Sequence, residues 1–260
     1  MPFIFPLEIE ETILNHLADT RAALETCSLV CRAFLPICRK HIFGRITFIY
    51  REDHEKSLIP AFERLLRETP EIADYIRIFD YSIRAEDLTS PSIQELLKRI
   101  SKLKIFIIQT HDHYESEFNW ENSPIRPALL HLLHLPTLTH FKMIRINNFV
   151  VSDLTPCVNL KYLDIGSYTT VAAENTFPAL ASLPEHSIHL NEFESGTGTS
   201  KLIMKLCSAR RPDGLPIIDF RSLSKLKVYL EDHNGSEGRE ATWELLRCCR
   251  NLTDVHIYCK

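Results

Sequence analysis

Three cysteines near the start of the chain, Cys27, Cys31 and Cys38, are the first candidates for chemistry, because thiolates bind soft metal ions. Cys27 and Cys31 are four residues apart and share one face of a predicted helix. Soft-metal sites usually combine one close cysteine pair with a second matched pair, and this region has no second pair. Since buried cysteine is a common small core residue, we expect no metal here.

Histidines form two further groups. His111-Asp112-His113 lies in a predicted loop, and His131 and His134 lie three residues apart on a predicted helix. The helical pair lacks the glutamate that a metalloprotease helix carries. The sequence identifies no histidine that would act as a general base for the last three cysteines, Cys248, Cys249 and Cys259. We expect the histidines to be solvated or to cap helices.

The glycine-rich stretch at residues 195–201, Ser-Gly-Thr-Gly-Thr-Ser-Lys, resembles a phosphate-binding loop at first sight. The Gly-Lys-Ser/Thr ending of such loops is absent. Neither a Gly-x-Ser-x-Gly motif nor a dinucleotide-binding fingerprint occurs elsewhere in the sequence. We therefore expect a loop that caps the next helix through Thr199 or Ser200, no cofactor, and no enzyme activity.

Composition limits the expected partners and the expected cellular location of the protein. The 260 residues include 30 Lys and Arg against 34 Asp and Glu, a net charge of −4, so neither nucleic acid nor an acidic membrane surface is the expected partner. No signal peptide and no membrane span is predicted, because basic flanks and long apolar runs are missing. The 8 cysteines then indicate reduced thiols and a cytoplasmic or nuclear location, or both.

The elements that must position these residues begin with three short predicted helices in residues 1–48. Pro6 precedes an acidic first turn, and apolar residues recur at helical spacing as far as Leu17. Pro36 is expected to end or restart the second helix, whose apolar face is made by Leu24, Cys27, Cys31, Phe34 and Leu35. The third carries Ile37, Ile42 and Phe43. Because Leu29 and Val30 fall off the second helix's apolar face, they need cover from the rest of the chain or from a partner.

Four stretches of this module carry a family likeness. Residues 5–9 read Phe-Pro-Leu-Glu-Ile, residues 13–17 read Ile-Leu-Asn-His-Leu, residues 24–34 read Leu-Glu-Thr-Cys-Ser-Leu-Val-Cys-Arg-Ala-Phe, and residues 42–43 are Ile-Phe. In order and spacing they resemble the F-box, which opens with Leu-Pro-x-Glu-Ile and continues with Leu-x-x-Cys-Ser-Leu-Val-Cys-Arg-x-Trp/Phe, and they are most like its fungal members. Phe5 and Phe34 replace the usual Leu and the commoner Trp, and both keep a large apolar side chain.

The resemblance implies a substrate-receptor subunit of an SCF-type ubiquitin ligase. Such a module binds the Skp adaptor, and through it a cullin ligase. The adaptor contacts that this implies are Pro6, Ile9, Leu14, Leu17, Leu29 and Val30. The alternative for each of these residues is that it belongs to the module's own core.

Residues 49–260 alternate predicted helices with short strands, and the strands share the pattern Leu-x-x-apolar-x-apolar. The copies are Leu103-Phe106-Ile108, Leu138-Phe141-Met143, Leu160-Leu163-Ile165, Leu223-Leu226-Val228 and Leu252-Val255-Ile257, with a weaker one at Leu183-His186-Ile188. The pattern resembles leucine-rich repeats, in which each unit buries its apolar face against the next. The family's Asn or Cys at the ninth position is absent, since the corresponding positions hold His111, Ile146, Tyr168 and Lys260.

We therefore expect a mixed α/β chain with an F-box-like helical module in residues 1–48. An irregular leucine-rich-repeat-like solenoid of helices and short parallel strands would follow in residues 49–260. An ordinary α/β domain with a parallel sheet is the alternative fold. A non-catalytic repeat scaffold, in which the F-box-like helices only cap the solenoid, is the alternative function. In the solenoid, an unknown protein target would face residues near the strands, for which the candidates are His140, Lys142, Lys161, Lys227 and His256.

Overall fold

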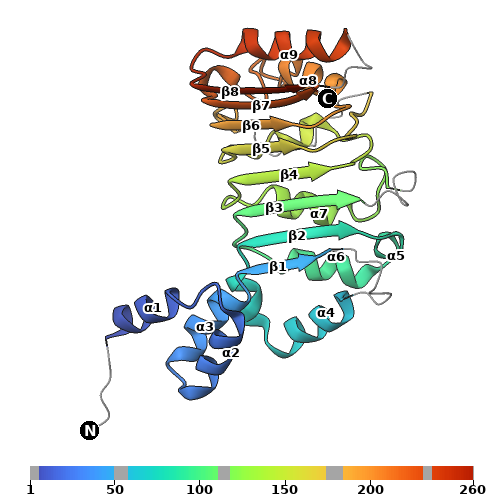
Figure 1. Cartoon of the computed structure of the whole chain (residues 1–260). Helices are drawn as coiled ribbons and strands as arrows, with labels where there is room; N and C mark the ends of the chain where they lie inside the picture. The colour runs from blue at the N-terminus through green and yellow to red at the C-terminus, as the bar shows by residue number, and fades with distance from the viewer. Residues whose placement is uncertain (1–5, 50–57, 111–117, 174–183, 231–235, 260) are drawn as a thin grey trace.

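The chain forms a mixed α/β structure around a single parallel sheet (Figure 1). It is a computed structural model that describes residues 6–49, 58–110, 118–173, 184–230 and 236–259. Eight strands pair in chain order, each parallel to the next. They are β1 (Arg45–Phe48), β2 (Ile78–Ile83), β3 (Ile105–Thr110), β4 (His140–Ile144), β5 (Tyr162–Ile165), β6 (Glu192–Ser195), β7 (Lys225–Leu230) and β8 (Asp254–Cys259).

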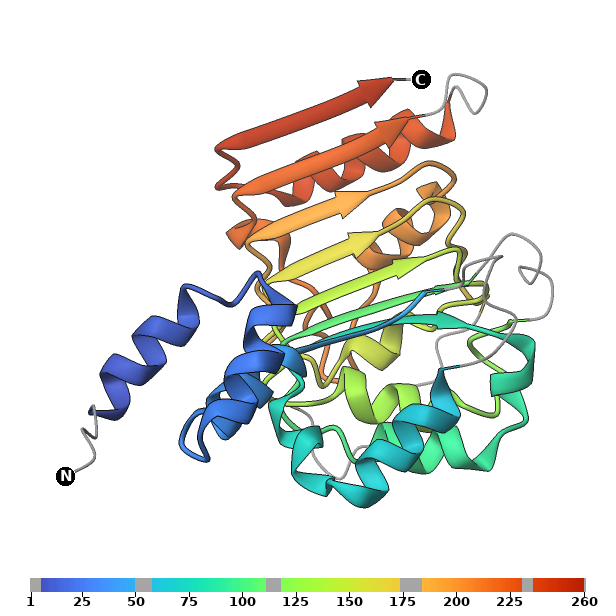
Figure 2. The same ribbon diagram turned by 60° about the horizontal axis from the view of Figure 1, so that its bottom comes forward.

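The helices that connect the strands lie on one face of the sheet, and no described helix covers the other face (Figure 2). The connecting α-helices are α4 (Ile59–Glu68), α5 (Ala85–Leu88), α6 (Pro91–Lys98), α7 (Arg126–Leu133), α8 (Ser200–Ser208) and α9 (Glu237–Cys248). Short 3₁₀ turns are η1 (Pro70–Tyr75), η3 (Val151–Leu154) and η4 (Phe220–Ser222). Parallel pairing requires such crossovers, because a tight turn cannot bring the chain back to the same end of the sheet.

Each strand is entered in the same way. The carbonyl of the residue just before one strand accepts hydrogen bonds from two N–H groups at the start of the next strand. Gly44 O accepts from Arg77 N and Ile78 N, and Ser224 O accepts from Thr253 N and Asp254 N. In most strands two apolar residues then point toward the helices, since side chains alternate across a strand. In register, Phe79 lies beside Phe106 and Tyr81 beside Ile108.

The recurring pattern is therefore longer than the sequence predicted. The four copies from Leu103 to Val228 are buried as expected. Two earlier copies, Phe43-Ile46-Phe48 and Ile76-Phe79-Tyr81, belong to β1 and β2. The weak copy at Leu183-His186-Ile188 is wrong, because β6 uses Leu190, Phe193 and Ser195, and Leu183 lies outside the described residues. In the last copy Val255 and Ile257 remain 44% and 45% exposed, because no described element packs over β8.

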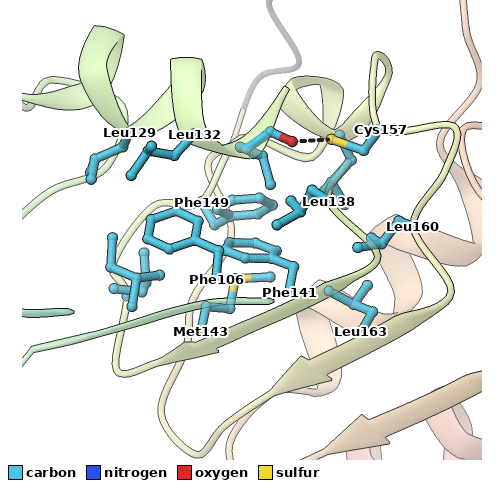
Figure 3. Close-up of a cluster of buried hydrophobic side chains, with 14 of the residues drawn as sticks. Phe106, Leu129, Leu132, Leu138, Phe141, Met143, Phe149, Cys157, Leu160 and Leu163 are labelled. Atoms are coloured by element: carbon cyan, nitrogen blue, oxygen red, sulfur yellow. Dashed lines mark hydrogen bonds between the residues drawn. The ribbon is translucent and has the colours of Figure 1, made fainter. Parts of the chain in front are cut away.

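Aromatic rings stack through the core from one strand to the next. The centroids of Phe79 and Phe106 are 6.4 Å apart, those of Phe106 and Phe141 5.6 Å, and those of Phe141 and Phe149 6.2 Å. Figure 3 shows Phe106, Phe141 and Phe149 between the strands and Leu129 and Leu132 of α7. In the same cluster the thiol of Cys157 donates a hydrogen bond to Leu133 O at 3.4 Å. Rings in offset contact stabilise the core beyond the area that they bury.

The first helices are α1 (Leu7–Asn15), α2 (Arg21–Val30) and α3 (Phe34–Ile42). The second helix ends earlier than predicted, because Cys31 is extended (φ −152°, ψ 158°) and Phe34 already begins α3. Pro36 does not end a helix: it is the third residue of α3, where the first turn needs no backbone donor. The four residues fully enclosed by this module are Leu14, Leu24, Ile37 and Cys38.

Residues 45–48, which the sequence analysis grouped with the helical module, form the first strand of the sheet. β1 pairs with β2 over its whole length, from Arg45 opposite Ile78 to Phe48 opposite Tyr81. The ring of Phe48 lies 5.3 Å from that of Phe62 in α4. Residues 45–48 therefore belong to the sheet, and the helical part ends with α3.

Candidate protein-interaction surfaces

The helical module exposes apolar side chains on α1 and α2. Leu29 is 87% exposed, Val30 69%, and Ile9 45%. Ile13, which the sequence analysis did not select, is 49% exposed and lies one helical turn after Ile9. Its i,i+4 spacing from Ile9 was the signal that could have identified it.

The six expected adaptor contacts divide into two groups. Pro6, Ile9, Leu29 and Val30 are exposed. Leu14 is only 1% exposed and Leu17 is half-buried, and both pack in the module's own core. For Leu14 and Leu17 the structure favours the core alternative, because both pack with Leu24, Ile37 and Cys38. We call the exposed set Ile9, Ile13, Leu29 and Val30 the module surface.

Leu29 and Val30 are exposed because of where α2 ends. The chain becomes extended at Cys31, so the last turn of α2 has no continuing helix beside it. Leu24, earlier on the opposite face, takes the buried position. Exposed apolar residues that lie together usually mark an interaction site, whereas scattered ones need no explanation.

The second surface is the open face of the sheet, which carries polar side chains in register across the strands. Lys142 of β4, Asp164 of β5, Glu194 of β6 and Lys227 of β7 are neighbours in one row, and His256 of β8 continues it. The expected target-facing residues Lys142, Lys227 and His256 therefore share this row. His140 lies on the same face of β4, and Lys161 is exposed just before β5.

Ion pairs link these strands. Lys142 Nζ lies 2.6 Å from Asp164 Oδ2, Lys225 Nζ 2.8 Å from Glu192 Oε1, and Lys227 Nζ 3.6 Å from Glu194 Oε2. Burial raises the pKa of Asp164, and the hydrogen bond from Lys142 opposes that rise. The Tyr162 hydroxyl donates to Glu194 at 3.2 Å, and burial raises the pKa of Tyr162 above its usual range. Two of the residues expected to contact a target, Lys142 and Lys227, are thus already paired with carboxylates of neighbouring strands.

A hollow of about 750 Å³ opens on this face at the carboxyl ends of β4 to β7. Two adjacent glycines, Gly166 and Gly196, line it where side chains would otherwise stand. Tyr168 and Tyr229 also line it, together with the Lys142 and Asp164 pair. The sequence analysis named Tyr168 only as a missing repeat residue and did not name Tyr229, because their proximity depends on strand register.

The candidates for metal or acid–base chemistry have structural roles. The His131 ring lies 3.2 Å from Ile100 O, and His134 Nε2 lies 2.8 Å from Asp153 O, so both rings hydrogen-bond to backbone. Within the described residues no three His, Cys, Asp or Glu side chains gather to hold a metal ion. The eight cysteines are free thiols. Burial raises the pKa of Cys249 to about 12, which disfavours the reactive thiolate. His111-Asp112-His113 lies outside the described residues.

The glycine-rich stretch leads into α8, but it does not cap the helix as predicted. Thr199 occupies the position before α8, and its hydroxyl donates to Gly196 O at 2.8 Å and makes no bond to the helix N–H groups. Ser200 is the first residue of the helix. The loop is closed by this Thr199 bond and by Gly198, whose φ is +72°.

No protein-family model, no curated protein and no solved structure matches the chain. Within the described residues, no helix combines the length and the apolar character needed to cross a bilayer.

Proposed function

We propose that this chain is the substrate receptor of an SCF-type ubiquitin ligase. In this proposal α1–α3 are an F-box that binds a Skp adaptor, and the sheet and its helices are an irregular leucine-rich-repeat-like solenoid that holds a protein target. The exposure of Ile9, Ile13, Leu29 and Val30 on one small module carries the proposal.

The module surface supports adaptor binding in two ways. A helical unit of this size buries little surface by itself, so apolar side chains left outside are expected to be covered by a partner. Two of the exposed residues, Leu29 and Val30, lie in the stretch that resembles the F-box most closely, Cys-Ser-Leu-Val-Cys-Arg. Interfaces of this kind depend on a few buried apolar anchors.

The order of the strands supports a solenoid over an ordinary α/β domain. Doubly wound sheets reverse their strand order at a switch point, where ligands bind. Here β1 to β8 follow one another without reversal, and every strand keeps the register of its neighbours. Each unit then contacts only adjacent units, which is the physical definition of a solenoid.

The mechanism would be positional. A receptor that holds its target beside a ubiquitin-charged enzyme raises the effective concentration of the target there, so the receptor needs no reactive group of its own. The target would lie on the open sheet face, and the ligase on the opposite end of the chain beyond α1. Cytoplasm or nucleus is the corresponding location.

The test is co-expression of the full chain with a Skp adaptor, followed by size-exclusion chromatography. A one-to-one complex that survives the column would support the F-box. A monodisperse chain that elutes separately from the adaptor would overturn it.

A second candidate is a repeat scaffold in which α1–α3 only cap the sheet. One contact favours it: Arg39 of α3 lies 3.0 Å from Glu71 of η1, which fastens the module to the first unit. A cap, however, does not account for four exposed apolar side chains. The same column distinguishes the two functions.

A further inference from the structure

The hollow on the open sheet face has a lining that indicates the chemistry of its ligand. It lies where β4, β5, β6 and β7 end, and its volume is about 750 Å³. Pockets of this volume accept a large side chain or a small molecule. The inference below rests on the proposed function, because it takes this face as the one that meets the target.

Charged groups at the hollow are already neutralised. Lys142, Asp164 and Glu194 line the hollow and, with Lys227, form two oppositely charged pairs, 2.6 Å and 3.6 Å apart. Arg145, a further lining residue, also has an interaction within the structure. A charged ligand group would have to displace one of these partners or remain unpaired in a partly dry site, and both cost free energy. The electrostatics of the hollow therefore favour an uncharged group.

The floor of the hollow is backbone. Ile144, Gly166 and Gly196 follow one another across β4, β5 and β6 just beyond the paired residues. A Cβ on Gly196 would lie 2.4 Å from Ser167 N, so only glycine allows this approach of the two chains. An added Cβ on Gly166 would lie 2.6 Å from Cγ1 of Ile144, so the Ile144 side chain lies over this backbone and gives the floor its apolar surface.

Two tyrosines form the walls. Tyr229 stacks on Tyr258 with ring centroids 4.7 Å apart, which fixes its position on the β7 side. On the β5 side Tyr168 is 52% exposed. Its ring lies beside Gly198, because a Cβ added to Gly198 would be 3.4 Å from Tyr168 Cδ1. Aromatic rings of this kind supply large contact area at low entropic cost.

The backbone of Tyr168 has a conformation that suits glycine better than tyrosine. Its φ is +61°, a region that bulky side chains disfavour. Gly198 is the equivalent residue in the next unit, and its φ is +72°. Tyr168 lies eight residues after Leu160, and Gly198 lies eight residues after Leu190, the leucines that precede β5 and β6. Glycine would meet the backbone demand at position 168 without strain. Strain held at an exposed aromatic residue is typical of a binding site.

We propose that the hollow takes up an aromatic side chain of the target protein, between the rings of Tyr168 and Tyr229 and over the backbone of Gly166 and Gly196. Aromatic side chains in a pocket are the commonest anchors of protein interfaces. Ring-on-ring contact with the two tyrosines would contribute beyond the buried area. The ion pairs beside the hollow would stay intact and exclude water from its edge.

The test uses the full chain with ¹³C-labelled isoleucine methyl groups, because Ile144 lines the hollow. N-acetyl-tryptophanamide, N-acetyl-argininamide and N-acetyl-aspartic acid amide are titrated separately. We expect a saturable shift of the Ile144 methyl with the tryptophan derivative and little change with the other two. Ile107, on the same face of β3, is the internal reference. An equal or larger response to either charged probe would overturn the proposal.

Variants make the test specific. Tyr168→Gly removes the wall and the backbone strain together, so we expect affinity for the tryptophan probe to fall at least threefold while Tm stays equal or rises. Tyr168→Phe keeps the ring and should bind as the original chain does. Unchanged affinity in Tyr168→Gly would contradict the proposal. Adaptor co-purification is measured on the same samples: loss of adaptor binding with an intact Ile144 response would reject the proposed function alone.

Discussion

The guanidinium of Arg126 lies 2.8 Å from the carboxylate of Asp153, which is completely buried. The indole Nε1 of Trp120 donates to the same carboxylate at 2.7 Å. Trp120 precedes α7 and Arg126 begins it, both between β3 and β4, whereas Asp153 lies in η3, between β4 and β5. The Asp153 side chain therefore ties two successive connections of the sheet together.

Asp153→Ala should lower the free energy of unfolding by about 3–5 kcal/mol, because it leaves Arg126 without its charge partner and a buried indole N–H unpaired. Trp120→Phe removes a single hydrogen bond to Asp153 and is expected to cost about 1–3 kcal/mol. Urea unfolding monitored by circular dichroism gives both values. A loss below about 1 kcal/mol for Asp153→Ala would contradict this account.

His134 should make stability depend on pH. Burial lowers the pKa of His134, against a weaker opposing effect of its hydrogen bond to Asp153 O. The unfolded chain therefore takes up a proton at about pH 6.5, where the folded chain does not, and stability falls as pH drops through that value toward the folded pKa. His134→Gln keeps an N–H donor without titrating. We expect a smaller loss of unfolding free energy between pH 7.5 and pH 5.5 in this variant, and identical losses would show that His134 is not responsible.

Leu29→Asp with Val30→Asp should abolish adaptor binding while the chain stays folded. The two side chains are 87% and 69% exposed, so the charges cost little in the free chain but would be buried unpaired in a complex. We expect at least a tenfold loss of affinity, about 1.4 kcal/mol or more, with Tm within a few degrees of the original. Met204→Asp, at an exposed apolar position on α8, is the matched control and should bind normally. Normal binding by the double variant would reject the module surface.

Ser195→Ala should stabilise the chain. The Ser195 hydroxyl is buried without a hydrogen-bond partner among the described residues, in register between Ile165 and Val228. Its removal is expected to raise the free energy of unfolding by about 0.5–2 kcal/mol. Ser187→Ala is the control, since that hydroxyl donates to Pro216 O at 2.6 Å and its loss should destabilise. Chemical denaturation of both variants would reveal opposite signs, and a loss in Ser195→Ala would contradict the prediction.

Much of the fold was predictable because its signals are local. Apolar residues at helical spacing predicted α4, α6, α7, α8 and α9 near their observed positions, and the alternating pattern after a leucine predicted four buried strands. Where other residue types fill the same positions, the pattern failed. Phe43 and Ile76 take the position of the leading leucine before β1 and β2, and Ser195 takes an apolar position in β6. A buried serine carries no apolar signal, so the sequence analysis placed that strand's pattern too early.

By itself, the amino-acid sequence determined the mixed α/β class, the alternation of helix and strand, and the likeness of the first module to an F-box. Only the tertiary structure decided which apolar residues are covered, because Ile13 and Leu14 are adjacent in the chain yet one is 49% exposed and the other 1%. It also brought Lys142, Asp164, Glu194 and Lys227 into one row, although each is more than twenty residues from the next. Periodicity reports which residues share a face of one element. The register between elements, which neutralises these charges and leaves Tyr168 and Tyr229 around a hollow, comes from packing of the whole chain.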